Sequence, residues 1–190
     1  NARRDTGQDT RGILREGFGM LKENSLWGNI FKSKIKEDAA VINILRKIPV
    51  FDDLNRRELA AIERILHRRE YNHDEIIFRE GDPGAGMYII ETGRVDIVRE
   101  PDMHVLAELN DGEFFGELAL LDDSPRTATA IVKIPCKMLC FLQPDMLDMI
   151  ERNPRLGTKV LLRLARTMGE RLKKSNEQIQ ALKEELSIKT

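Results

Sequence analysis

The sequence has no long apolar run and almost no net charge. Its 190 residues carry a formal net charge of -1, so no overall attraction to nucleic acid or to a membrane surface is expected. No apolar stretch approaches the ~18 residues of a membrane span, and the N-terminal segment NARRDTGQDTRG contains no apolar signal core. With 41% hydrophobic and 33% charged residues, the composition predicts a soluble, globular, cytoplasmic protein.

Cysteine and histidine are also scarce. Cys136 and Cys140 lie four residues apart in a predicted strand, which separates them by roughly 13 Å, too far for a disulfide within that strand. A single C-x3-C lacks the second ligand pair of a zinc site, and the three histidines, at positions 67, 73 and 104, form no metal-binding pattern. The sequence therefore predicts reduced, buried thiols and no metal, which argues against a metalloenzyme.

Helical patterns dominate the first third of the chain. Between residues 13 and 35, apolar residues recur at helical spacing and predict one or two amphipathic helices. These helices have two open interpretations, a flap that covers the domain or a segment that docks a partner. A further helix is predicted before Pro49, and Asn55 is a good N-cap for the next one.

Short β-prone runs then alternate with turn signals such as Thr92-Gly93 and Asn110-Asp111-Gly112. The runs are residues 76–78, 87–90, 95–98, 105–109, 127–134 and 136–142. Strands at this spacing predict an antiparallel sandwich or barrel. The predicted fold class is therefore mixed α+β, with a jelly-roll-like antiparallel β-roll flanked by N-terminal helices and a long C-terminal helix.

Pro154 opens this long helix, and its apolar residues form a heptad seam. The seam positions, with alternating spacings of four and three, are Leu161, Ala165, Met168, Leu172, Ser175, Ile179, Leu182 and Leu186. So narrow a seam is hard to satisfy within one domain and predicts a parallel homodimer. The expected interface residues are Leu161, Met168, Leu172, Ile179 and Leu182.

The most informative segment is FGELALLDDSPRTATA, residues 115–130. Gly116 allows close approach of a ligand to the backbone, and Glu117, when ionised, accepts a hydrogen bond from a hydroxyl. Arg126, nine residues after Glu117 and behind the stiffening Pro125, supplies a fork suited to phosphate oxygens. The alternative interpretation is a surface ion pair between Glu117 and Arg126 on an ordinary loop.

This segment resembles the phosphate-binding cassette of the cyclic nucleotide-binding domain family. That family includes bacterial catabolite activator proteins, regulatory subunits of cyclic-AMP-dependent protein kinase, and cyclic-nucleotide-gated channels. REGDPGAGMYIIETGRVDIV, residues 79–98, resembles the glycine-marked hairpins of the same family. The resemblance implies a ligand site in the cassette, made of Gly116, Glu117, Leu118, Ala119, Pro125, Arg126, Thr127 and Ala128.

Further ligand contacts are predicted outside the cassette. Ile97 and Leu106 are expected as apolar walls. GERLKKSNEQIQAL resembles the catabolite activator branch, which implies that Ser175 and Asn176 contact the purine; the alternative is a solvated polar position that sets the register. A hydroxyl residue after the phosphate arginine, here Thr127, resembles both cyclic-GMP-responsive members and bacterial cyclic-AMP receptors, so it leaves the choice of base open.

The sequence thus predicts a non-catalytic sensor of cyclic AMP, and possibly of cyclic GMP, with no metal and with a cyclic purine nucleotide as partner. Its expected organisation is a polar tail and helical extension (1–37), the β-roll with flanking helices (38–151) and a C-terminal dimerisation and signalling helix (152–190). Alternatives are a truncated transcription regulator, which requires a helix-turn-helix, and a ligand-free dimerisation scaffold. An enzyme or metal protein on a cupin-like roll requires clustered ligands that the sequence lacks.

Overall fold

The structure, a computed structural model, describes residues 38–188. The amphipathic helices predicted between residues 13 and 35 lie outside the described residues. Residues 38–45 are helical, and α2 (Arg56–Glu63) follows. Asn55 caps α2 as predicted, because its side chain accepts hydrogen bonds from the amides of Arg57 and Glu58 while the Glu58 carboxylate accepts from the Asn55 amide. This reciprocal arrangement satisfies donors that a helix N-terminus otherwise leaves free.

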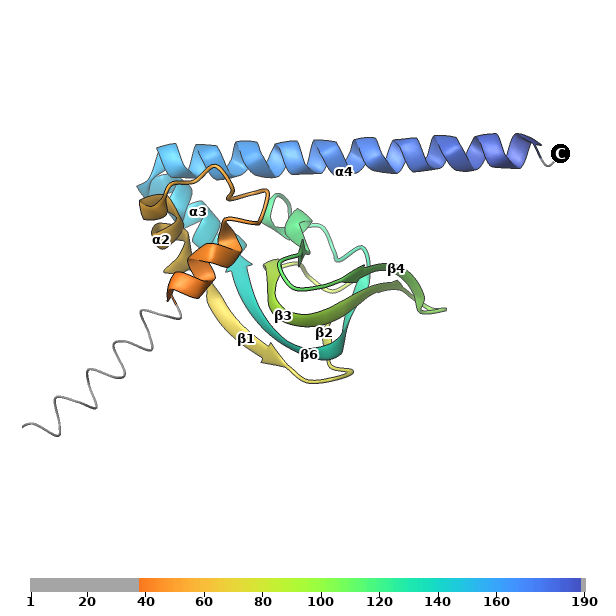
Figure 1. The fold of residues 1–190 in the computed structure, drawn as a ribbon, viewed down its shortest axis with the longest axis horizontal. Helices are drawn as coiled ribbons and strands as arrows, with labels where there is room; N and C mark the ends of the chain where they lie inside the picture. Colours follow the sequence, from red (N-terminus) through yellow and green to blue (C-terminus); the bar gives the residue numbers. More distant parts are fainter. Residues whose placement is uncertain (1–37, 189–190) are drawn as a thin grey trace, which may run out of the picture. The chain divides into compact units, whose positions relative to one another are not determined.

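One antiparallel sheet of six strands forms the roll. Its strands are β1 (His67–Tyr71), β2 (Ile76–Phe78), β3 (Gly86–Arg99), β4 (His104–Leu109), β5 (Phe114–Phe115) and β6 (Thr129–Leu142). The two long strands, β3 and β6, pair along most of their length and curve together (Figure 1). In addition β3 pairs with β4 and β5, and β6 pairs with β1 and β2. With the long C-terminal helix, this arrangement confirms the predicted fold class.

Four strands differ from the prediction by more than a single end residue. The strand β5, with only two residues, was not among the predicted runs. The strand β1 was not predicted, because HRREY has no apolar alternation and every residue of it except Tyr71 is exposed. The strand β3 continues through Gly93, where a turn was expected; register shifts against β6 absorb the irregularity. The runs 127–134 and 136–142 are largely one strand, β6, which continues through Pro135.

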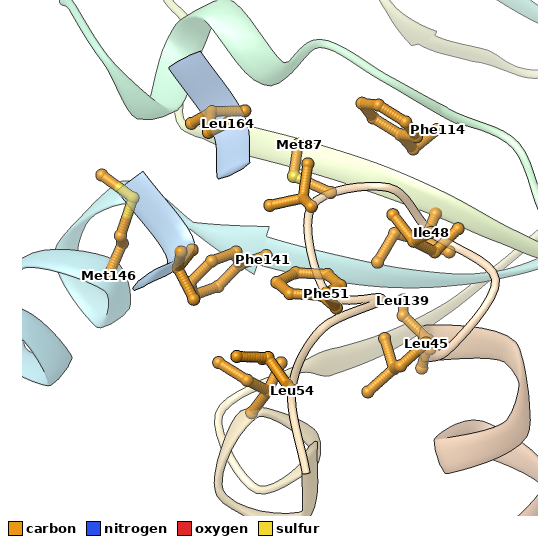
Figure 2. Packing of buried hydrophobic residues seen from close by; sticks show 14 of the residues in the cluster. Leu45, Ile48, Phe51, Leu54, Met87, Phe114, Leu139, Phe141, Met146 and Leu164 are labelled. Carbon is orange, nitrogen blue, oxygen red and sulfur yellow. The ribbon is translucent and has the colours of Figure 1, made fainter. Parts of the chain in front are cut away.

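Two apolar cores fill the structure. The helix-side core joins the helical segments to one end of β3 and β6, with Phe51 and Phe141 at its centre (Figure 2). The roll core lies among the strands, and its buried members include Phe115, Val132 and Met138. Cys136 and Cys140 are free and buried, as predicted, and burial raises the pKa of both thiols because desolvation disfavours the thiolate.

Two helices follow the roll: α3 (Gln143–Arg152) and α4 (Pro154–Ile188). The first part of α4 buries Leu156, Val160 and Leu164 in the helix-side core. Ion pairs hold it to the preceding segments, since Lys159 pairs with Glu58 at 2.7 Å and Arg163 pairs with Asp52. Apolar contacts therefore fix this part of α4 to the helix-side core, and ion pairs fix it to α2 and the segment before it.

The predicted seam is divided between two environments. Leu161 and Met168 pack, partly buried, against the helix-side core. The distal seam residues are exposed: Leu172, Ile179, Leu182 and Leu186. Among the described residues, the predicted interface positions Leu172, Ile179 and Leu182 are therefore exposed to solvent, whereas Leu161 and Met168 are partly buried.

Gly93 is required by both its backbone and its surroundings. Its φ is +112°, and an added Cβ would lie 2.5 Å from the Cys136 Sγ and 2.6 Å from the Pro135 carbonyl oxygen. Gly112 also has a positive φ, +81°, but open space around its Cα. Gly112→Ala therefore isolates the backbone penalty, about 1–2 kcal/mol.

We expect Gly93→Ala to lower the free energy of unfolding by a further ~1–3 kcal/mol beyond Gly112→Ala, because it adds overpacking against β6. Urea unfolding of the parent and the two variants measures this difference. Equal losses in the two variants would show that the contact with β6 relaxes without cost.

Candidate functional site

A cavity of about 410 Å³ opens beside the segment between β5 and β6. Its walls come from that segment, from β2, β3, β4 and β5, and from α4. The lining residues are Phe78, Ile97, Ala107, Leu109, Phe114, Phe115, Gly116, Glu117, Leu118, Ala119, Asp122, Ser124, Pro125, Arg126, Thr127, Ala128 and Arg171. The lining is mostly apolar, with two arginines and two carboxylates among it, a composition typical of small-molecule sites.

Gly116 begins the short 3-10 helix η1 (Glu117–Leu120) in a left-handed conformation with φ of 72°. A Cβ at this position would lie 2.6 Å from Nη1 of Arg126. Only glycine therefore allows both this turn and the observed position of the arginine. The turn brings Glu117 into the cavity wall and leaves its side chain buried.

Arg126 is a buried cation with backbone partners. Its residue is 7% exposed. Nη1 donates to the Gly116 carbonyl at 3.0 Å, and Nη2 donates to the Gly86 carbonyl at 2.9 Å. Nε is buried and has no hydrogen-bond partner among the described residues. Neutral carbonyls do not cancel the charge, so the side chain has an unmet preference for an anion.

Glu117 pairs with α4 and not with Arg126. Its Oε1 accepts from Nη1 of Arg171 at 2.7 Å. Arg171 also donates from Nη2 to the Phe114 carbonyl at 3.3 Å, and its guanidinium lies 4.5 Å from the centre of the Phe114 ring. The interpretation of Glu117 and Arg126 as a surface ion pair is therefore wrong, because both are buried and Glu117 has another partner.

Burial dominates the electrostatics around Arg126. It lowers the pKa of Arg126 from its ordinary value, because desolvation disfavours the cation. The guanidinium still keeps its charge, since an arginine side chain is not deprotonated in proteins. Beside it, burial also raises the pKa of Tyr88, so this phenol stays neutral. The cavity thus offers one buried cation, a carboxylate already bound to a second cation, and apolar walls.

The family model described as cyclic nucleotide-binding domain matches residues 68–153. The chain belongs to the cyclic nucleotide-binding domain family. The matched residues contain all six strands except the first residue of β1, together with η1, Glu117 and Arg126.

Curated and solved proteins agree with this assignment. The chain is 32% identical over 125 residues to the cyclic AMP receptor protein of Thermus thermophilus, covering 64% of this chain and 58% of that protein. It is 33% identical over 96 residues to a cAMP-dependent protein kinase regulatory subunit of Colletotrichum orbiculare, covering 50% of this chain and 25% of that protein. A crystal structure of a cyclic nucleotide-binding domain from Methylobacillus flagellatus superposes with a TM-score of 0.67 and 25% identity, covering 76% of this chain and 83% of that one.

The two curated relatives are therefore longer than the matched region, and the chain spans only part of each. Among residues 38–188, no helix is both long and apolar enough to cross a membrane. Within the same range, no three His, Cys, Asp or Glu side chains are grouped as a metal site.

Nine of the twelve predicted site residues line the cavity of this cyclic nucleotide-binding domain. They are Ile97 and the eight cassette residues Gly116, Glu117, Leu118, Ala119, Pro125, Arg126, Thr127 and Ala128. Leu106 is exposed and outside the lining, so its prediction as an apolar wall is corrected. Ile97 pairs with Ala107 and Val98 with Val105, so Leu106 is an additional residue in β4, and its neighbours Ala107 and Leu109 form the wall instead.

Ser175 and Asn176 are exposed on the distal part of α4 and do not line the cavity. Asn176 borders a shallow groove on the helix surface. Their contact with a purine was expected in a dimer, which one chain does not test, so it stays a prediction.

Sequence reasoning missed Arg171 and Phe78. Arg171 lies one helical turn before Ser175, on the face of α4 that was expected to meet the ligand, so helical periodicity contained the signal. Phe78 ends a predicted strand, and nothing in its local sequence indicates that it contacts Arg126.

Proposed function

We propose that this domain is a non-catalytic sensor that binds a cyclic purine nucleotide, cyclic AMP or cyclic GMP, and passes the signal through α4. The observation that carries the proposal is Arg126, a buried cation on an apolar cavity whose Nε has no hydrogen-bond partner within residues 38–188. A phosphodiester supplies the single negative charge that this cation lacks. The similarity to a cyclic AMP receptor protein supports the same ligand class.

Glu117 is assigned to the ribose. Arg171 occupies its Oε1, and Oε2 takes no part in that bond, so a 2′-hydroxyl can donate to it. Ile97, Ala107 and Leu109 then offer an apolar surface to the purine. The cassette residues Leu118, Ala119, Pro125 and Ala128 complete the wall, with Gly116 giving the backbone room.

Arg171 provides the route to α4. It joins the ribose carboxylate to the helix at the point where α4 leaves the helix-side core. A ligand that changes the hydrogen bonding of Glu117 alters the free energy of this ion pair. If α4 has two positions relative to the roll, the ligand can favour one of them only by binding more tightly to the domain in that position.

The functional unit is proposed to be a parallel homodimer. Large apolar side chains at Leu172, Ile179, Leu182 and Leu186 are uncovered along one helix, and a second copy would remove them from water. In such a dimer Ser175 and Asn176 are assigned to the purine. The same proposal divides the chain into residues 1–37, 38–151 and 152–190. It also places the protein in the cytoplasm and assigns it no metal, nucleic acid or membrane as a partner.

Two other functions remain testable beside it. A transcription regulator requires a DNA-binding element elsewhere in the protein, and the similarity to the N-terminal domain of a transcriptional regulator from Streptomyces coelicolor favours that output. A ligand-free scaffold requires that the cavity bind no nucleotide. Titration of cyclic AMP and cyclic GMP against ligand-free protein separates a sensor from a scaffold.

Arg126→Ala is expected to weaken cyclic AMP binding by roughly two to three orders of magnitude, because loss of one partner of a buried charge pair costs about 3–5 kcal/mol. Glu117→Ala should cost one to two orders, since a hydrogen bond to a charged group contributes about 1.5–3 kcal/mol. Isothermal titration calorimetry measures both, with Arg99→Ala, an exposed arginine of β3, as the control. Unchanged affinity in a folded Arg126→Ala protein would refute the site.

Leu172→Glu together with Ile179→Glu should convert the homodimer to monomers, because the charges face each other along the exposed seam. The control is Lys173→Glu together with Gln180→Glu. Each of these residues follows a seam residue by one position and lies outside the seam, so the control should leave the dimer intact. Light scattering at tens of micromolar reports the mass. A parent protein that is already monomeric there would refute the dimer.

Cyclic AMP and cyclic GMP are expected to bind within about tenfold of each other, because a single hydrogen bond discriminates by only about 0.5–1.5 kcal/mol. Thr127 lines the cavity and is assigned to the guanine amino group. Thr127→Ala should therefore weaken cyclic GMP and spare cyclic AMP, whereas Thr127→Ser should retain both. Competition binding measures the ratio, and equal losses for the two nucleotides would remove Thr127 from base recognition.

A further inference from the structure

Phe78, the last residue of β2, covers the face of Arg126. The guanidinium carbon lies 4.1 Å from the centre of the Phe78 ring, within the range of a cation–π contact. Phe78 is half-buried and lines the cavity. The ring and the arginine come from segments 48 residues apart in sequence, so the contact depends on the fold of the roll.

Two more aromatic rings fix the position of Phe78. Its ring centre lies 5.8 Å from that of Tyr88 and 5.8 Å from that of Phe115. Tyr88 and Phe115 stack on each other at 5.4 Å with an interplanar angle of 14°. The three rings form an aromatic shelf (Phe78, Tyr88 and Phe115) under the guanidinium. Because β2, β3 and β5 each supply one ring, the shelf is part of the sheet.

The shelf and the two carbonyls use different parts of the guanidinium. The carbonyls of Gly86 and Gly116 accept from Nη2 and Nη1 at its edge. The Phe78 ring contacts its face, which carries no N–H group. An aromatic ring therefore restrains the arginine without using any of the donors that an anion needs.

We propose that Phe78 is a positioning residue for Arg126, whose aromatic ring holds the guanidinium at the cavity in the orientation that receives the phosphate. The inference rests on the proposed function, because it assigns how the phosphate-binding side chain is preorganised. Rigid placement before binding removes part of the entropic cost of forming the complex.

The test compares an aromatic with an aliphatic residue at position 78. Phe78→Leu keeps an apolar side chain but removes the ring, and Phe78→Tyr keeps the ring. We expect Phe78→Leu to weaken cyclic AMP binding about five- to thirtyfold and Phe78→Tyr to stay within about threefold of the parent. Phe51→Leu, the same change in the helix-side core away from Arg126, controls for lost stability and should leave the affinity unchanged.

A double-mutant cycle separates positioning from direct contact with the ligand. Arg126→Lys retains a cation but lacks the planar face that stacks on a ring. The loss caused by Phe78→Leu should therefore shrink to less than about threefold in the Arg126→Lys protein. Calorimetry measures all four affinities, and circular dichroism with thermal unfolding establishes that each variant is folded.

Each contrary result has its own meaning. A parent that binds neither cyclic nucleotide refutes the proposed function and, with it, this inference. A parent that binds while Phe78→Leu binds equally well, or more tightly, refutes the positioning role alone. Equal losses from Phe78→Leu in both backgrounds would show that the ring contacts the ligand itself and would also overturn the inference.

Discussion

The burial of the Arg126 charge is the constraint on which the site depends. A permanent cation is costly to remove from water unless polar groups surround it. Here the compensation comes from two backbone carbonyls and an aromatic face, from residues Gly86, Gly116 and Phe78. All three groups belong to the strands of the roll or to the segment between them, so the roll and the candidate site are stabilised together.

The long paired strands explain how these groups meet. Gly86 begins β3 and pairs with Leu142 at the end of β6, while Phe78 lies opposite Ala130 near the start of β6. Close strand contact is built into the backbone here, because a Cβ on Gly86 would lie 2.2 Å from the Phe141 carbonyl oxygen. The cavity is thus positioned by sheet pairing, although most of the residues that line it belong to the connecting segment.

The same distinction decides how much could be predicted from the sequence. The cassette could be predicted because Gly116, Glu117 and Arg126 are close in the chain and carry distinctive chemistry. The hydrogen-bond acceptors of Arg126 could not be predicted, because any residue can supply a backbone carbonyl and Gly86 is 40 residues away in sequence. The prediction for Leu106 was wrong because β4 contains an extra residue, and such a local irregularity in register changes which side chains face the cavity.

The helix α4 is constrained unevenly, and this gives Arg171 its significance. Up to Met168, apolar packing and the ion pairs of Lys159 and Arg163 hold it to the rest of the domain. From Leu172 to Ser187 every residue is exposed. Arg171 stands at this boundary, bound to Glu117 and the Phe114 carbonyl. In the proposed function, a ligand that binds this carboxylate would therefore act at the point where the helix passes from packed to exposed residues.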